Sequence, residues 1–366
     1  MSDLLQFTPD PPVRVNDVRI GCIGAGMIMA ECHLPAYRSA GFPVVAIASR
    51  TRARAEAVAQ RHGIAKVHDT PFALIEDPDV EIVDLAFPPD LQPDLLRHAL
   101  RQPHVKGVLI QKPLALTLNE AISLREAAAA SGKLVSVNQN MRFDQSMRVL
   151  HELLDRNALG IPVFAEINMH AIPHWQGFLQ QYDRLTLLNM SVHHLDIMRF
   201  LFGDPSEVTA VVRPDPRTGF EHTDGLVVST LRFPSGLLAL SLEDVWSGPS
   251  NSGFTADPFI RWRVEGTEGI AQGTIGWPTG AVSTLTYASN TETGGQWITP
   301  TWDSMWFPDA FVGVMEQLQY AVRTGTEPLL TIADNVGTAA LVEAAYRSIA
   351  DGRTVRLSEF PTTAKA

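Results

Sequence analysis

The chain has 366 residues, a net charge of −11 at pH 7 and 45% hydrophobic residues. It is longer than one typical domain and apolar enough for sizeable cores, so two domains are expected. The 40 acidic residues outnumber the 29 Lys and Arg residues, which argues against nucleic acid and anionic membranes as partners. No apolar run reaches transmembrane length, and Cys22 and Cys32 are expected to be buried thiols of a cytoplasmic protein.

Residues 1–15 contain three prolines and no apolar core of a signal peptide, so they are predicted to form a loose arm. After this arm, an apolar run from Val18 leads into Gly24-Ala-Gly26, a pattern typical of a dinucleotide-binding turn. Gly24 permits the tight turn, and Gly26 lets the backbone approach a pyrophosphate. The helix that follows would offer its first N–H groups, at Met27 and Ile28, to the same phosphates. Met29 stands where the motif has its third glycine.

The next apolar run, Phe42 to Ser49, is typical of a strand buried on both faces of a parallel sheet. An acidic residue that binds the adenosine ribose is expected about 20 residues beyond the fingerprint. The chain has Ser49 and Arg50 at that point instead. Arg50 can pair with a 2′-phosphate, but an arginine there can equally stack on adenine, so the sequence leaves NAD and NADP open.

Strands and helices continue to alternate through residue 137. Apolar runs predict further strands at 80–86, 107–110 and 134–137. Thr70-Pro71 and the capping box Thr117-Leu-Asn-Glu120 predict helix starts, and a helix is also expected from Asp94 to Gln102. This alternation predicts a doubly wound parallel sheet whose ligand binds at the carboxyl ends of the strands.

From Met141 the pattern changes to that of an α+β domain. A helix is predicted from Asp144 to Asn157, followed by alternating apolar runs that predict a large, mostly antiparallel open sheet. Amphipathic helices are expected from about Asp309 to Thr324 and from about Ile332 to Ala350.

These patterns divide the chain into three parts. Residues 1–15 form the arm, 16–140 the dinucleotide-binding Rossmann domain, and 141–366 a domain for substrate binding and oligomerisation. An open sheet left exposed is a liability for aggregation, so we expect it to serve as the face of a homo-oligomer.

Several motifs together resemble those of the Gfo/Idh/MocA oxidoreductase family over nearly the whole chain. They are Gly24-Ala-Gly26, His33-Leu-Pro-Ala-Tyr37, Phe87-Pro-Pro-Asp90, Gln111-Lys-Pro113 and Asn140-Met-Arg-Phe143. The resemblance implies that Phe87, Pro88, Gln111, Lys112 and Asn140 line the cofactor site. In the family the strand after the third crossover ends in Glu-Lys-Pro, with the lysine reaching substrate and nicotinamide. Lys112 is the matching residue, and Gln111 replaces the glutamate.

The segment Asn189-Met-Ser-Val-His193 is similar to the family's Asp-x-Gly-x-His. There the histidine takes the proton of the substrate hydroxyl and the aspartate supports it. His193 matches the histidine and Asn189 replaces the aspartate, and the two positions are expected to share a helical face. Asp196, one turn beyond His193, is an alternative source of the missing carboxylate.

Two further residues are candidates for substrate contact. His194 follows the matched histidine, and Trp175 lies where the family lines its sugar pocket, although either can equally be a structural residue. Adjacent helical residues point about 100° apart, so His193 and His194 are not expected to share a metal ion, and no metal is predicted.

The resemblance implies an NAD- or NADP-dependent dehydrogenase that oxidises a sugar or polyol. Without the carboxylates at 111 and 189, the protonated forms of Lys112 and His193 should be less favoured than in the usual family site. A weaker base suits the acidic anomeric hydroxyl of an aldose, which favours oxidation at C1 to a lactone. The motifs also resemble a subgroup that includes dehydrogenases of D-apiose. The alternatives are an inositol-type polyol dehydrogenase, a glycosidase that recycles bound NAD, and a nucleotide-binding sensor without catalysis.

Overall fold

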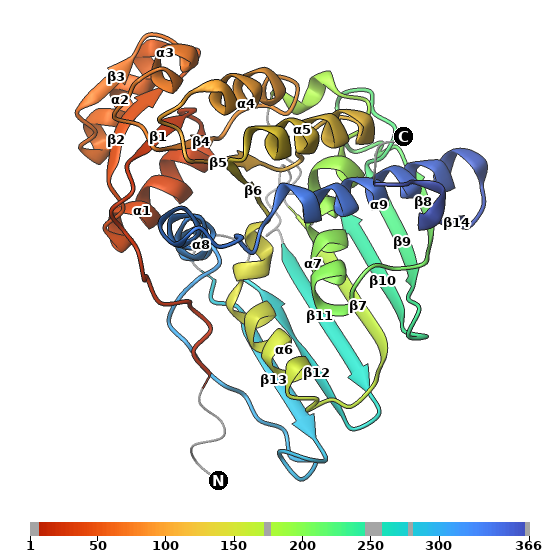
Figure 1. The fold of residues 1–366 in the computed structure, drawn as a ribbon. Helices are drawn as coiled ribbons and strands as arrows, with labels where there is room; N and C mark the ends of the chain where they lie inside the picture. The colour runs from red at the N-terminus through yellow and green to blue at the C-terminus, as the bar shows by residue number, and fades with distance from the viewer. Residues whose placement is uncertain (1–6, 172–176, 246–257, 277–280, 363–366) are drawn as a thin grey trace. The chain divides into compact units, whose positions relative to one another are not determined.

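The structure is a computed structural model that describes residues 7–171, 177–245, 258–276 and 281–362. Its residues form two compact units, each built from separate stretches of the chain (Figure 1). Of the described residues, those within Pro11–Asn140 and Phe307–Ala339 belong to the Rossmann unit, and those within Met141–Trp306 and Ala340–Pro361 belong to the sheet unit.

The Rossmann unit contains a six-stranded parallel sheet in the order β3-β2-β1-β4-β5-β6. Its strands are β1 (Ile20–Ile23), β2 (Val44–Ala48), β3 (Lys66–His68), β4 (Ile82–Leu85), β5 (Gly107–Gln111) and β6 (Leu134–Asn138). This order reverses beside β1, so the first turn lies at the switch point where such sheets bind dinucleotides. The predicted doubly wound sheet is confirmed, and β3 is a short strand that the apolar pattern did not predict.

Helices connect successive strands of this sheet. They are α1 (Leu34–Ala40), α2 (Arg52–His62), α3 (Pro71–Ile75), α4 (Gln92–Arg101) and α5 (Leu118–Ser131). Thr70 caps α3 by accepting a bond from the Ala73 N–H at 3.0 Å, and Thr117 caps α5 through the Glu120 N–H at 3.2 Å. Both predicted caps therefore end the loops that lead into these helices.

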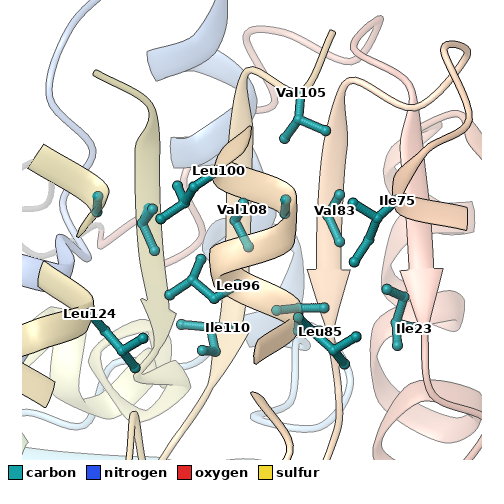
Figure 2. Packing of buried hydrophobic residues seen from close by; sticks show 14 of the residues in the cluster. Ile23, Ile75, Val83, Leu85, Leu96, Leu100, Val105, Val108, Ile110 and Leu124 are labelled. Atoms are coloured by element: carbon teal, nitrogen blue, oxygen red, sulfur yellow. The ribbon is translucent and has the colours of Figure 1, made fainter. Parts of the chain in front are cut away.

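A cluster of buried aliphatic residues holds helices α3, α4 and α5 on the sheet (Figure 2). Leu96 and Leu100 of α4 lie among Val83, Val108 and Ile110 of the strands. Each such side chain contributes about 1.5–3 kcal/mol on burial, so this layer fixes the strand ends that carry the site.

Helix α8 (Ala310–Thr324) belongs to the Rossmann unit although it follows the second sheet in the chain. Glu316, buried in α8, accepts two side-chain bonds from Arg14, at 2.9 and 3.0 Å. The Gln319 amide bonds the backbone N–H and C=O of Val18, at 3.0 and 2.8 Å. These bonds tie a late helix to the start of β1.

The sheet unit is built on an eight-stranded mixed sheet in the order β13-β12-β11-β7-β10-β9-β8-β14. Its strands are β7 (Pro162–His170), β8 (Glu207–Arg213), β9 (Leu226–Arg232), β10 (Leu238–Asp244), β11 (Phe259–Gly266), β12 (Gly269–Ile275), β13 (Thr284–Ser289) and β14 (Val355–Arg356). Only β7 and β10 pair in parallel, so the prediction of a mostly antiparallel sheet is confirmed for the described strands.

Helices α6 (Gln145–Asp155) and α7 (Val192–Phe202) pack on one face of this sheet (Figure 1). Asp144 caps α6, with Oδ1 accepting from the N–H groups of Ser146 and Met147. Helix α9 (Ile332–Asp351) is followed by the short strand β14. Among the described helices, none is both long and apolar enough to span a membrane.

Candidate active site

The turn after β1 has the geometry that a dinucleotide cradle requires. Gly24 has φ +121°, and a Cβ there would lie 2.3 Å from the carbonyl oxygen of Ala86, so no other residue fits. A Cβ on Gly26 would meet no atom within 4 Å. The backbone at Gly26 is therefore open to a pyrophosphate, and the Rossmann unit fits a bound dinucleotide at this turn.

The helix behind this turn begins as a π-helix, η2 (Ile28–His33), and continues as α1. Met29, at the position of the missing third glycine, is fully buried. Pro35 near the start of α1 has no N–H to donate to the preceding turn, and the wider π-turn lies just before it. Met27 is 53% exposed, so the first helical N–H groups lie at the surface of the Rossmann unit.

The end of β2 carries the residues predicted to meet the adenosine ribose. Ser49 is 9% exposed, whereas Arg50 is exposed, with its guanidinium carbon 5.6 Å from the centre of the Phe87 ring. Nearby Arg52 is already paired with Glu56, at 2.8 Å, and with Asp69. Arg50 therefore lies beside Phe87, in the turn that follows β4, whereas Arg52 is held by acidic residues.

The structure gathers all the predicted cofactor residues at one edge of the parallel sheet. They follow or end successive strands: Gly24, Gly26, Met27 and Ile28 after β1, Ser49 and Arg50 after β2, Phe87 and Pro88 after β4, Gln111 and Lys112 at β5, and Asn140 after β6. This is the carboxyl edge, where open α/β sheets bind their ligands. Their individual roles remain predictions.

Lys112 is held at this edge by its neighbours. Its backbone N–H donates to Oε1 of Gln111 at 3.2 Å. The buried Gln92 side chain accepts from the Gln111 N–H at 2.9 Å and donates to the carbonyl oxygens of Gln111 and Pro113, each at 3.3 Å. Burial lowers the pKa of Lys112 to about 8, because desolvation disfavours the ammonium form.

The second group of predicted residues lies in the sheet unit, where helix α7 begins. Asn189 lies in a short π-helix, η5 (Leu187–Ser191), and His193 and His194 lie in the first turn of α7. The structure therefore brings Asn189 and His193 onto one helical segment. In a π-helix the backbone hydrogen bonds join residues five apart, and each turn is wider than in an α-helix. Asn189 and His193 are therefore not separated by the single α-helical turn that the spacing predicts.

Asp224 fixes the start of this segment from outside it. Its buried carboxylate accepts from the Leu185 N–H at 2.7 Å and the Leu187 N–H at 2.8 Å. The Tyr346 hydroxyl of α9 donates to the same carboxylate at 2.9 Å. Burial raises the pKa of Asp224 and, together with the nearby carboxylate, that of Tyr346. Asp224 thus caps the helix that carries Asn189.

His194 is 1% exposed and bonds to a buried acid of β10. Its Nδ1 lies 2.6 Å from Oε1 of Glu243, and the Ser241 hydroxyl donates to the same oxygen at 2.6 Å. A carboxylate on Nδ1 fixes the ring orientation of a histidine. The role of His194 in substrate contact remains a prediction.

Asp196, the alternative carboxylate for His193, forms a buried ion pair with Arg142. Oδ2 accepts from Nε at 2.6 Å and Oδ1 from Nη2 at 2.7 Å, a bidentate geometry. The side chains are only 5% and 1% exposed. The charge of Asp196 is therefore compensated by a guanidinium within the same unit.

Comparison with known proteins assigns both domains to one family. Residues 18–139 match the oxidoreductase family with an NAD-binding Rossmann fold, and residues 147–272 match the C-terminal domain of the same Gfo/Idh/MocA family. The chain belongs to the Gfo/Idh/MocA family. The resemblance carried by its motifs is thereby confirmed.

Two proteins with known activities are similar to this chain in sequence. D-apiose dehydrogenase of Paraburkholderia graminis is 25% identical over 385 residues, covering 100% of this chain and 96% of the relative. 1,5-Anhydro-D-fructose reductase of Ensifer adhaerens is 29% identical over 257 residues, covering 69% of this chain and 74% of the relative.

A solved structure shares the fold. An oxidoreductase from Agrobacterium radiobacter, crystallised with NAD+, L-tartaric acid and magnesium, superposes with a TM-score of 0.81 at 23% identity. The match covers 94% of this chain and all of that one. Within the described part of this chain, no group of three or more His, Cys, Asp or Glu side chains could hold a metal ion.

Trp306 contacts His193, the residue that matches the family's histidine. Its ring packs edge-on against His193, with centroids 6.3 Å apart, and it is 3% exposed. Trp262 is also buried and donates to the Ser146 hydroxyl at 3.1 Å. Trp175 lies outside the described residues, so its predicted contact with substrate stays a prediction.

Sequence reasoning missed the buried polar residues that support the predicted ones. Asp84 lies within the apolar strand β4, and Glu243 is one of the inward-facing residues of β10, in line with Ala239 and Ser241. An acid at such a buried position is a signal that it has a hydrogen-bonding partner. The sequence alone did not say which partner, because these partners lie on distant elements.

Proposed function

We propose that this chain is an NAD(P)-dependent dehydrogenase that oxidises the anomeric C1 hydroxyl of an aldose to a lactone, with D-apiose as the candidate substrate. The observation that carries the proposal is the clustering of Lys112 with the cofactor residues at the carboxyl edge of the Rossmann sheet. The named activities of the relatives, which include D-apiose and inositol dehydrogenases, support a sugar or polyol substrate.

The proposed roles follow from the chemistry of the two side chains. Bound nicotinamide supplies a hydride acceptor. Lys112 donates a hydrogen bond to the substrate hydroxyl and stabilises the negative charge that develops on its oxygen. His193 takes the hydroxyl proton as general base, a task for which imidazole is suited near neutral pH. Asn189, four positions before His193, supports it in place of the family aspartate.

The choice of an anomeric hydroxyl rests on the weak basicity of this site. Gln111 and Asn189 carry no charge, and the carboxylate of Asp196 is neutralised by Arg142. Amides stand at 111 and 189 where the family has carboxylates, and we propose that the resulting base is weaker than in the usual family site. This suits an anomeric hydroxyl, which is more acidic than a secondary alcohol. These features support an aldose over an inositol.

Incubation of the purified protein with a panel of aldoses and inositols tests the proposal. NAD+ and NADP+ are supplied separately, and the absorbance of reduced nicotinamide is followed together with the product by NMR. We expect D-apiose to give the largest kcat/KM and a lactone or its hydrolysed acid. Faster oxidation of an inositol ring hydroxyl would overturn the aldose assignment but leave the dehydrogenase assignment standing.

For the cofactor, we propose that the adenosine site admits a 2′-phosphate. Ser49 and Arg50 stand where an acid usually binds the ribose, and an arginine there can pair with that phosphate. Arg50→Ala should lower kcat/KM for NADP+ by about ten- to a hundredfold, the effect of losing a charge-assisted hydrogen bond, and change that for NAD+ little. Exposed Arg54 in the first turn of α2 gives the matched control, Arg54→Ala. An equal loss with both cofactors would contradict the proposal.

The pH dependence of oxidation tests the proposed state of Lys112. Because its pKa is lowered to about 8, Lys112 is protonated below that pH and neutral above it. If the ammonium stabilises the developing oxyanion, kcat/KM must fall as the pH rises through about 8. Residual activity of Lys112→Arg should lack this descending limb, since guanidinium stays protonated. A rate that instead rises through pH 8 would make neutral Lys112 the proton acceptor.

We further propose a homo-oligomer formed through the face of the eight-stranded sheet that α6 and α7 do not cover. Val211 of β8 is 61% exposed and Leu238 of β10 is 48% exposed. Large apolar side chains so exposed on a sheet are typical of a protein interface.

A further inference from the structure

Four buried polar side chains form a network in the Rossmann unit next to Lys112. His33 ends the π-helix η2, Asp84 lies in β4, and Gln111 and Asn138 are paired in register on β5 and β6. All four are at most 7% exposed. The hydrogen bonds that reach the His33 ring indicate which of its nitrogens donates and which accepts.

On one side of the His33 ring, Nδ1 carries the proton. Nδ1 lies 2.7 Å from Oδ2 of Asp84, and the Tyr37 hydroxyl donates to the same oxygen at 2.7 Å. A bare nitrogen at that distance from a carboxylate oxygen would place two lone pairs against each other. His33 therefore donates through Nδ1 to Asp84.

On the other side of the ring, the Gln111 amide determines the state of Nε2. Oε1 of Gln111 accepts from the Lys112 N–H, so its other amide atom, Nε2, is the group that faces the ring, at 3.1 Å from Nε2 of His33. The amide nitrogen of Asn138 faces the same ring nitrogen at 3.1 Å. Amide nitrogens only donate, so Nε2 of His33 is an acceptor without a proton.

The two sides together make His33 neutral, with its proton on Nδ1. This state gives the Gln111 amide one orientation, with its nitrogen toward His33 and its oxygen toward the Lys112 backbone. Gln92 holds the carbonyl oxygens on either side of Lys112. The backbone of Lys112 is thus fixed on both flanks by buried amide groups.

We propose that Gln111 is a positioning residue for Lys112, held in its working orientation by a neutral His33 that is protonated on Nδ1. The inference rests on the proposed role of Lys112 as the group that binds the substrate hydroxyl. It assigns Gln111 a task through its side chain that is separate from contact with the cofactor.

Nitrogen-15 NMR of histidine-labelled protein at neutral pH tests the proton positions directly. The signals of His33 are those that disappear in His33→Gln. If His33→Gln does not fold, the His33 signals are identified as those that change in Gln111→Glu. We expect a protonated Nδ1 and an unprotonated Nε2 in the wild-type protein. In Gln111→Glu a carboxylate oxygen faces Nε2, so both nitrogens should become protonated. A wild-type imidazolium, or a proton on Nε2 alone, would overturn the inference.

Kinetics of two matched variants test the positioning. Gln111→Leu removes the acceptor for the Lys112 N–H and should lower kcat about tenfold or more while the KM for cofactor changes less than about threefold. Gln111→Glu keeps an acceptor oxygen for the Lys112 N–H and should therefore lower kcat less than Gln111→Leu does. Equal losses in both variants, or none in Gln111→Leu with an unchanged unfolding midpoint, would contradict the positioning role.

The two proposals fail in distinguishable ways. Full activity in a Lys112 variant would remove the proposed function, yet the NMR result for His33 would stand. An unexpected tautomer of His33 would remove this inference, yet the loss of activity in the Lys112 variant would stand.

Discussion

Lys112→Met should lower kcat/KM for sugar oxidation by about a hundred- to a thousandfold, the effect of removing one donor that stabilises a developing oxyanion. Methionine keeps the length and volume of the lysine stem but has no ammonium group. The loss should appear mainly in kcat, because the charge on the substrate oxygen develops only in the transition state. Steady-state rates of nicotinamide reduction measure it.

Lys106 supplies the matched control for this substitution. Lys106 comes directly before β5, and Lys112 comes directly after it. The exposed ammonium group of Lys106 pairs with Glu81 at 2.6 Å. Lys106→Met should change kcat/KM less than about twofold, since exposed pairs contribute little to stability. If Lys112→Met retains activity within tenfold of this control, Lys112 does not bind the reacting hydroxyl.

His193→Ala should lower kcat by about a hundred- to ten-thousandfold, because it removes the general base. The cavity left by the imidazole allows a sharper readout than loss alone. Added imidazole should restore part of the rate in proportion to its concentration if the missing group is a base. The rate of nicotinamide reduction at increasing imidazole concentration measures this rescue.

His151 of α6 is the control histidine in the same unit. It is partly exposed and lies 3.0 Å from Asp155, one turn further along the helix. His151→Ala should show neither the loss of rate nor the rescue. A full rate in His193→Ala, or a loss that imidazole cannot restore at any concentration while folding is intact, would count against His193 as the base.

The strand and helix pattern of the Rossmann unit could be predicted because its signals are local. Strands buried on both faces are continuously apolar, as in Val108 to Ile110. Thr70 and Thr117 are typical N-cap residues, and each indicates the start of the helix that it caps. Gly24 was recognisable because only glycine fits its left-handed backbone so close to Ala86.

Other features could not be predicted because they depend on residues far apart in the chain. Glu316 and Gln319 place α8 in the Rossmann unit through Arg14 and Val18, about three hundred residues away. The π-helices η2 and η5 share the apolar pattern of ordinary helices and so gave no separate signal.

The candidate site was predicted unevenly for the same reason. The family resemblance made Lys112 and His193 candidates, and their roles remain predictions. The residues that contact the segments carrying them were not anticipated. Asp224 reaches the segment before α7 from beside β9, and His33 reaches Gln111 from η2. Asp196 was a candidate partner of His193 on helical spacing alone, and the structure pairs its carboxylate with Arg142.

The alternatives to a dehydrogenase predict different fates for the cofactor. A glycosidase that recycles bound NAD would consume its substrate without net reduced nicotinamide. A nucleotide-binding sensor would bind cofactor, measured by calorimetry, and convert no sugar. An inositol-type dehydrogenase would reduce nicotinamide but take hydride from a ring carbon of the polyol.

One measurement tests the central claim most directly. D-Apiose labelled with deuterium at C1 is incubated with the purified protein and oxidised cofactor, and the reduced nicotinamide is analysed by mass spectrometry. We expect net reduced cofactor carrying one deuterium, formed by the wild-type protein and lost in Lys112→Met and His193→Ala. Reduced cofactor without deuterium would contradict oxidation at C1, and no net reduction with any aldose or polyol would contradict the dehydrogenase assignment itself.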